Sequence, residues 1–184
     1  MGGDERFRLF LALRLPGDAL DEVERWQSAQ LAGVGVRVVA RIQLHVTLAF
    51  LGSRPTGEVD AIVEVLRAAS ARACEIRLRP VGYRETRSVG MLVLDDANGN
   101  AAALAGDLHE RLERLGVYRR EPRPWLPHLT VARWRERPRL HPAPPPDRTF
   151  VPSDAAAYLS QLRPGGAEYR VLQSVALGLT VGGE

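Results

Sequence analysis

The stretch Leu44–Gly52 reads LHVTLAFLG, and a second stretch, Pro127–Trp134, reads PHLTVARW. Each run contains a His and a Thr two residues apart: His45 and Thr47 in the first, His128 and Thr130 in the second. Successive side chains of a β-strand point to opposite faces, so the His and the Thr of each run project from the same face. Each stretch therefore predicts a strand that buries one face and presents polar groups on the other.

The repetition of this pattern carries more weight than either copy. Two of the four His residues have a Thr two positions later, and both runs continue with an Ala, Ala49 and Ala132. One copy alone is compatible with a half-buried strand whose His and Thr satisfy each other or the backbone. Two matching copies are hard to obtain by chance, so the pair indicates a functional site.

The two motifs resemble those of the 2H phosphoesterases. They lie 83 residues apart, the first continues as TLxFLG, and the second is followed by Arg133. Within that superfamily the chain most resembles the RNA 2′,3′-cyclic phosphodiesterases, also known as 2′-5′ RNA ligase-like proteins. Other segments that resemble the family are FRLFLALRLP near the N-terminus and YLSQLRPGGAEYRVL near the C-terminus. The chain departs from the family at Val38, where an aromatic is usual, and at Gln161, where an Arg is usual.

The resemblance implies both a fold and a reaction. The fold is α+β and bilobal, with two antiparallel sheets and flanking helices around a central groove, and the two motif strands form a pseudo-two-fold repeat. Residues 1–184 are expected to form one such domain. The implied reaction is hydrolysis of RNA 2′,3′-cyclic phosphate termini to 2′-phosphates without a metal, with reverse joining through 2′-5′ linkages. The resemblance makes His45 the proton donor and His128 the proton acceptor, whereas the residues alone do not distinguish this assignment from its reverse.

Two imidazoles and two hydroxyls suffice for this chemistry without a cofactor. A neutral His takes a proton from water while a protonated His gives one to the leaving oxygen, and an ordinary pKa of about 6.5 allows both forms near neutrality. The hydroxyls of Thr47 and Thr130 donate to the non-bridging phosphate oxygens as negative charge grows on them.

Three more residues are candidates for substrate contacts: Arg133, Phe50 and Trp134. The resemblance implies that Arg133 contacts the phosphate or another part of the substrate. In a flat strand it would point away from His128, and a bulge or a strand end near Ala132 would reconcile the two. The aromatic rings are candidates to stack on a base of single-stranded RNA, with core packing as the alternative. The other two histidines, His109 and His141, are expected to be solvated.

Two other functions remain open at the level of sequence. A noncatalytic RNA-binding protein could use the same groove, although binding alone does not require two titrating groups. A metallohydrolase could hold a divalent ion between His45 and His128, but the chain lacks the HxxxH or nearby carboxylate spacing of such sites.

The composition indicates a single globular domain. The 184 residues are 45% hydrophobic, which is enough for one core, and the single cysteine excludes an internal disulfide. The N-terminus resembles neither a signal peptide nor a membrane span, so we expect a cytoplasmic protein without a membrane partner. The sequence shows no surplus amphipathic helix, so we expect a monomer. All 25 basic residues are Arg, which suggests coding bias, so the net charge of +3 supports an anionic ligand only weakly. The expected partners are RNA ends with a 2′,3′-cyclic phosphate, tRNA fragments among them, or small cyclic nucleotides.

Periodicity and turn residues predict the secondary structure. The predicted strands are 6–14, 34–39, 44–51, 75–83, 89–94, 128–134, 150–161 and 168–179. The predicted helices are 18–32, 59–69 and 104–115. The predicted irregular segments are 52–57, 117–127 and the proline-rich stretch 138–147.

Overall fold

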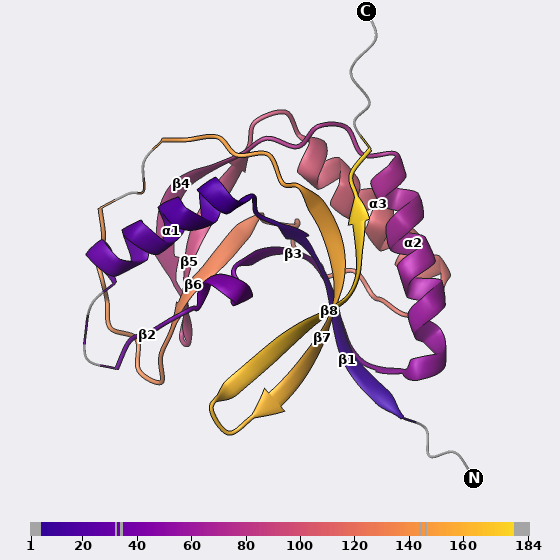
Figure 1. Ribbon diagram of the computed structural model, residues 1–184, viewed down its shortest axis with the longest axis horizontal. Helices are drawn as coiled ribbons and strands as arrows, with labels where there is room; N and C mark the ends of the chain where they lie inside the picture. Colours follow the sequence, from indigo (N-terminus) through magenta and orange to yellow (C-terminus); the bar gives the residue numbers. More distant parts are fainter. Residues whose placement is uncertain (1–4, 32, 34, 144, 146, 179–184) are drawn as a thin grey trace, which may run out of the picture.

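The computed structural model describes residues 5–31, 33, 35–143, 145 and 147–178 (Figure 1). Its strands are β1 (Arg6–Arg14), β2 (Arg37–Val38), β3 (His45–Pro55), β4 (Leu78–Glu85), β5 (Val89–Asp96), β6 (His128–Arg133), β7 (Asp154–Arg163) and β8 (Gly166–Ala176). Its helices are α1 (Gly17–Gln30), α2 (Val59–Ala71) and α3 (Asn100–Arg114), with short 3-10 turns η1 (Arg41–Gln43) and η2 (Thr56–Glu58). Residues 32, 34 and 179, which belong to predicted elements, lie outside the described residues.

The strands form one curled antiparallel sheet in the order β4-β5-β6-β3-β1-β7-β8, and β2 pairs with β6. The predicted α+β class with antiparallel strands is confirmed. The expected division into two sheets is wrong, because β3 pairs with β6 at Val46 and Leu129 and so joins the two halves. The two motif strands are therefore neighbours at the centre of the sheet.

The two faces of the sheet have different surroundings. Leu9, Leu11 and Leu13 of β1 belong to the main hydrophobic core, which includes the buried residues of the helices. The alternate residues, Phe10 and Ala12, form a smaller cluster with Ala156 and Tyr158 of β7. In Figure 1, α1 lies beside the half of the sheet formed by β4, β5 and β6, and α2 and α3 lie beside the other half. The helices thus cover one face and leave the other for the smaller cluster.

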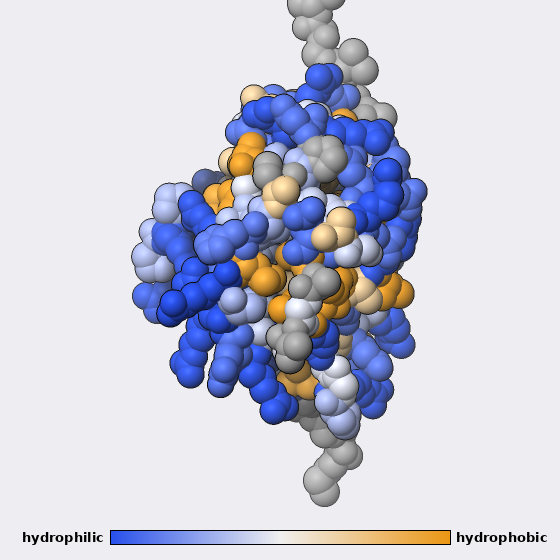
Figure 2. All heavy atoms as spheres, turned by 90° about the vertical axis from the view of Figure 1, so that its left-hand side faces the viewer, coloured by the Kyte–Doolittle hydropathy of each residue, from blue (hydrophilic) through white to orange (hydrophobic). Residues whose placement is uncertain are grey.

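Helix amphipathicity explains this covering. In α2 the buried residues Ile62, Leu66 and Ala69 follow each other at spacings of four and three, which place them on one face. Figure 2 shows the side of the molecule on which α1 lies, where hydrophilic side chains dominate the surface. Among the helices of the described residues, none is long and apolar enough to cross a membrane.

The first motif strand is longer than its sequence predicts. The Ser, Pro and Gly content of 52–57 predicts a loop, but β3 continues to Pro55. Gly52 has a φ of +67°, in the left-handed region that glycine adopts without steric cost. A register shift at this position, where Leu9 pairs with Gly52 and Phe10 with Phe50, lets the strand continue beside β1. A bulge therefore replaces the expected strand end.

The sheet curls until the β7–β8 hairpin reaches the segment before the first motif. Arg37 Nη1 of β2 donates to the carbonyl of Gly165 at the hairpin tip over 2.8 Å. Gln43 Nε2 of η1 donates to the carbonyl of Ala167 in β8. These bonds connect the β8 edge of the sheet to the turn that immediately precedes His45.

Ser70 of α2 offers a test of the packing of this core. Its side chain is fully buried, and its hydroxyl has no hydrogen-bond partner within the described part of the chain. Because a buried hydroxyl without a partner loses its hydration, we expect Ser70→Ala to raise the free energy of unfolding by up to about 1 kcal/mol. Urea unfolding followed by circular dichroism measures this change, and a clear loss of stability would contradict it.

Candidate active site

The pairing of β3 with β6 brings the two motifs face to face. Val46 and Leu129, which pair across the strands, each follow the His of their motif by one position. In an antiparallel pair the flanking residues then lie opposite in reverse order. Continued by one residue in each direction, this register sets His45 opposite Thr130 and Thr47 opposite His128. All four motif side chains are partly buried while Val46 and Leu129 are fully buried, so the four residues predicted from sequence share one face of the sheet.

Each motif strand contains a β-bulge three residues after its His. Between β1 and β3, Leu11 pairs with Ala49 and Ala12 with Thr47, so Leu48 is the additional residue. Between β5 and β6, Gly90 pairs with Ala132 and Met91 with Thr130, so Val131 is the additional residue. The two bulges occupy equivalent positions in the two motifs.

The bulges change which side chains share the face of the motif His and Thr residues. An additional residue shifts the alternation of a strand by one position. Val131 and Ala132 are both buried, and Arg133 is partly exposed as His128 and Thr130 are. In β3, Leu48 and Ala49 are likewise both buried, and Phe50 is exposed. The bulge expected near Ala132 is confirmed, and it brings Arg133 to the face of the motif.

The imidazoles of the two motifs are held in the same way. His45 Nδ1 lies 2.8 Å from the carbonyl oxygen of Gln43, and His128 Nδ1 lies 2.8 Å from that of Leu126. A carbonyl oxygen only accepts hydrogen bonds, so Nδ1 carries a proton in each ring. The Nε2 atoms are therefore the ones available for proton transfer. In the unliganded protein His45 Nε2 lies 3.1 Å from Thr47 Oγ1 and accepts a hydrogen bond from that hydroxyl.

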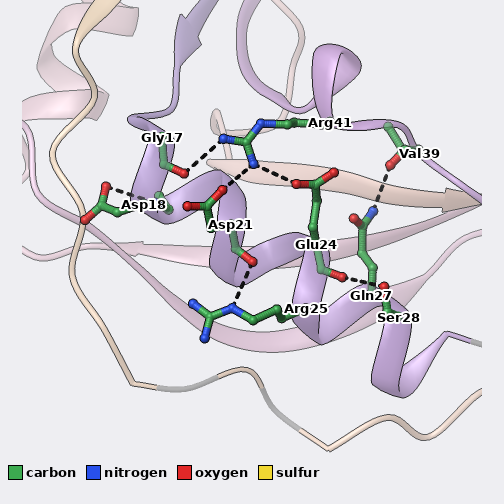
Figure 3. Close-up of polar contacts among 10 residues, drawn as sticks. Gly17, Asp18, Asp21, Glu24, Arg25, Gln27, Ser28, Val39 and Arg41 are labelled. Atoms are coloured by element: carbon green, nitrogen blue, oxygen red, sulfur yellow. Dashed lines mark hydrogen bonds and ion pairs between the residues drawn. The ribbon is translucent and has the colours of Figure 1, made fainter.

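Hydrogen bonds connect η1, the 3-10 turn that precedes His45, to α1. Arg41 of η1 donates to the carboxylates of Asp21 and Glu24, each over 2.6 Å, and to the carbonyl of Gly17 (Figure 3). Gln43, whose carbonyl accepts from His45, belongs to the same turn. The orientation of the first imidazole therefore depends on contacts made by the first helix.

Aromatic rings surround His45 on the face that carries the two motifs. Its ring centroid lies 4.8 Å from that of Phe10, 5.5 Å from that of Tyr169 and 5.8 Å from that of Tyr158. The resulting desolvation is the main cause that lowers the pKa of His45 from 6.5 to about 4, although the hydrogen bond to Gln43 acts in the opposite direction. The positive charges of His128 and Arg133 lower this pKa further, as expected for groups that face His45. Unliganded His45 is therefore neutral at pH 7.

The two aromatic candidates for base stacking differ in position. Phe50 is 49% exposed, and the guanidinium of Arg8 lies 4.8 Å from its ring centroid. Trp134 is only 7% exposed, packs in the main core, and donates its indole N–H to the carbonyl of Arg87. The prediction that Trp134 contacts substrate is wrong, because core packing and this hydrogen bond occupy the side chain.

Sequence patterns did not identify two buried polar side chains that lie near the motifs. His109, expected to be solvated, is 6% exposed and donates from Nε2 to the carbonyl of Leu48 over 2.7 Å. Gln27 is 2% exposed and donates to the carbonyls of Val39 and Val131. Each lies on the buried side of an amphipathic helix, which is the signal that could have identified it. His141, also expected to be solvated, is exposed.

Within the described residues, no group of three or more His, Cys, Asp or Glu side chains is arranged to hold a metal ion. The two motif histidines are accompanied by hydroxyls and an Arg. Such a set of donors is suited to binding an anion.

Comparison with known proteins agrees with this geometry. The family model described as the 2′-5′ RNA ligase superfamily matches residues 15–147, which is most of the chain. The chain belongs to this superfamily. The resemblance inferred from the two motifs is thereby confirmed.

Relatives and solved structures cover nearly the whole chain. It is 31% identical over 188 residues to an RNA 2′,3′-cyclic phosphodiesterase of Thermus thermophilus, with 92% of this chain and 90% of the relative covered. It is 25% identical over 170 residues to the Escherichia coli protein of the same name, with 92% and 96% covered. A Thermus thermophilus crystal structure aligns with a TM-score of 0.82 at 28% identity and covers 94% of this chain and 99% of its own. Escherichia coli LigT complexed with 3′-AMP shares the fold, with a TM-score of 0.80 at 23% identity over 95% and 99% of the two chains.

The aromatic cluster accounts for the pKa of His45, and this can be tested. Tyr169 is the partly buried member of the cluster, so Tyr169→Ala admits water to His45 without removing a fully buried core residue. Because desolvation is the largest cause of the shift, we expect the pKa of His45 to rise from about 4 toward 6.5. Nuclear magnetic resonance titration of the His45 ring measures it. An unchanged pKa would show that burial by these rings is not the cause.

Proposed function

We propose that this chain is a metal-independent RNA 2′,3′-cyclic phosphodiesterase that opens terminal cyclic phosphates to 2′-phosphates. The observation that carries the proposal is the matched pair of imidazoles, His45 and His128, each with Nδ1 bound to a backbone carbonyl and Nε2 left for proton transfer. The names of the relatives point to the same reaction. RNA ends, tRNA fragments among them, and small 2′,3′-cyclic nucleotides are the proposed substrates, and 2′-5′ joining is the reverse reaction.

In the proposed mechanism a water molecule attacks phosphorus as the bond from phosphorus to O3′ breaks. His128 Nε2 takes a proton from the water, and protonated His45 gives its Nε2 proton to O3′. The phosphate stays on O2′, His45 ends neutral, and His128 ends protonated until solvent restores the pair. The strain of the five-membered ring is released in the same step.

The low pKa of His45 fits this role when substrate is bound. In the unliganded protein burial and nearby positive charge keep His45 neutral. A phosphate anion placed against its Nε2 favours the protonated ring, and so raises the pKa of His45 as the substrate binds. The donor is then charged only when there is an oxygen to protonate.

The remaining residues of the site have roles that follow from their chemistry. Thr47 and Thr130 are proposed to donate their hydroxyls to the non-bridging oxygens, with Thr47 released from His45 when that ring is protonated. Arg133 is proposed to pair with the same oxygens through its guanidinium. Phe50 is proposed to stack on the base, with its exposed ring shared with Arg8.

We also infer that the site lies between two lobes related by an approximate two-fold axis. Val46 and Leu129 pair at equivalent motif positions, the bulges at Leu48 and Val131 are equivalent, and both His rings bond to the carbonyl two residues earlier. This symmetry supports the binding of one phosphate by both motifs.

The reaction is tested with an RNA oligonucleotide that ends in a 2′,3′-cyclic phosphate, incubated with purified protein in EDTA. We expect conversion to the 2′-phosphate, with kcat reduced by about 100-fold or more in His45→Ala and His128→Ala, because general acid and base catalysis each contribute that much. His141→Ala, which removes an exposed histidine outside the site, is the matched control. RNA bound without turnover by the wild type would instead support a noncatalytic RNA-binding protein, and activity restored only by added metal would support a metallohydrolase.

The assignment of donor and acceptor is tested with a substrate whose leaving O3′ is replaced by sulfur. A thiolate leaves without a proton, so the loss of the general acid matters less for this substrate. We expect the sulfur substrate to restore most of the lost kcat in His45→Ala and little of it in His128→Ala. Recovery in His128→Ala alone would reverse the two roles.

A further inference from the structure

We propose that Gln27 and His109 are positioning residues which hold the bulges of the two motif strands, and thereby keep Arg133 and Phe50 on the catalytic face. The proposal rests on the function proposed above, because it concerns the geometry of the same site. Neither residue touches the phosphate-binding face, and each comes from a helix that covers the opposite face of the sheet.

The contacts of His109 establish one half of the arrangement. His109 lies on α3, is 6% exposed, and has its ring 4.8 Å from that of Tyr118. Its Nε2 lies 2.7 Å from the carbonyl oxygen of Leu48, so Nε2 carries the proton and donates. Leu48 is the additional residue of the first bulge. The helix therefore supplies a donor at the position where the strand departs from regular pairing.

Gln27 occupies the corresponding place in the other half. It lies on α1, is 2% exposed, and its Nε2 donates to the carbonyl of Val131 over 2.9 Å and to that of Val39 over 3.0 Å. Figure 3 shows its side chain directed toward Val39, while Asp21 and Glu24 of the same helix engage Arg41. Val131 is the additional residue of the second bulge.

A bulge interrupts the ladder of strand hydrogen bonds, so donors from outside the strand pair help to satisfy the carbonyls beside it. The carbonyl of Val131 accepts from the backbone N–H of Val39 over 3.0 Å, and Gln27 supplies a second donor to the same oxygen. Both bulge residues are buried, Leu48 at 2% exposure and Val131 at 0%. A buried donor directed at each carbonyl stabilises the bulged backbone relative to regular pairing. Regular pairing would turn the residue two positions later, Phe50 or Arg133, toward the core. The donors therefore determine which face these side chains occupy.

Met and Gln side chains have nearly the same shape, so replacing one by the other removes a hydrogen-bond donor with little change in packing. Gln27→Met removes the amide donor at one bulge. At the other, His109→Gln keeps a donor and His109→Met does not. Ser70→Ala, a fully buried polar substitution on α2 away from both bulges, is the control and is expected to keep the kinetics of the wild type.

We expect Gln27→Met to lower kcat/KM for the cyclic-phosphate RNA by about 10- to 100-fold, because displacement of a phosphate contact by about 1 Å has this effect. His109→Met is expected to raise KM more than it lowers kcat, since Phe50 is proposed to bind the base. His109→Gln is expected to restore most of this loss. Equal defects in His109→Gln and His109→Met, or unchanged kinetics in a folded Gln27→Met, would overturn the proposal.

A second readout follows His45 by nuclear magnetic resonance. Arg133 lowers the pKa of His45, so its displacement in Gln27→Met should raise that pKa, as Arg133→Gln should. This titration needs no substrate, so it tests the positioning role separately from the enzymatic activity. Failure of the wild type to turn over RNA would contradict the proposed function and would leave this test valid. If the Met variants do not fold, hydrogen exchange in the wild-type protein provides the test. The side-chain donor protons of Gln27 and His109 should then exchange slowly with water, and rapid exchange would overturn the proposal.

Discussion

Strands β3 and β6 join the two halves of the sheet at one pair of residues, Val46 and Leu129, and the positions of the two motifs depend on this pairing. Both side chains are fully buried. A slip of one residue in either strand would turn His45 and Thr47, or their counterparts, toward the core, where unpaired polar groups are costly. The packing of two apolar side chains therefore sets the register of a polar site on the opposite face.

The helices also combine apolar packing with polar contacts to the motif strands. They cover one face of the sheet with apolar residues and so provide the core that a small domain requires. Gln27 and His109 interrupt this apolar packing with polar groups, and both direct a donor to a carbonyl of a motif strand. Such buried polar groups are retained only where each finds its partner. The helices thus influence the two motifs from the opposite face of the sheet.

The two histidines share a hydrogen-bonding arrangement but differ in surroundings. Phe10, Tyr158 and Tyr169 surround His45, which disfavours its charged form in the unliganded protein. Among the described residues, no aromatic ring packs against His128. Two titrating groups of one type in different environments are a common basis for separate acid and base roles. Sequence symmetry at the motifs is therefore compatible with chemical asymmetry between them.

The sequence by itself determined the two motif strands, the three helices and the four motif residues, because periodicity and side-chain type are local properties of the chain. It also indicated the family, and it left two ways, a bulge or a strand end near Ala132, for Arg133 to share the face of His128. Only the tertiary structure decided that one sheet replaces two, that Trp134 is buried, and that His109 and Gln27 reach the bulges of β3 and β6. These features depend on contacts between residues 47 to 104 positions apart, which no local pattern specifies.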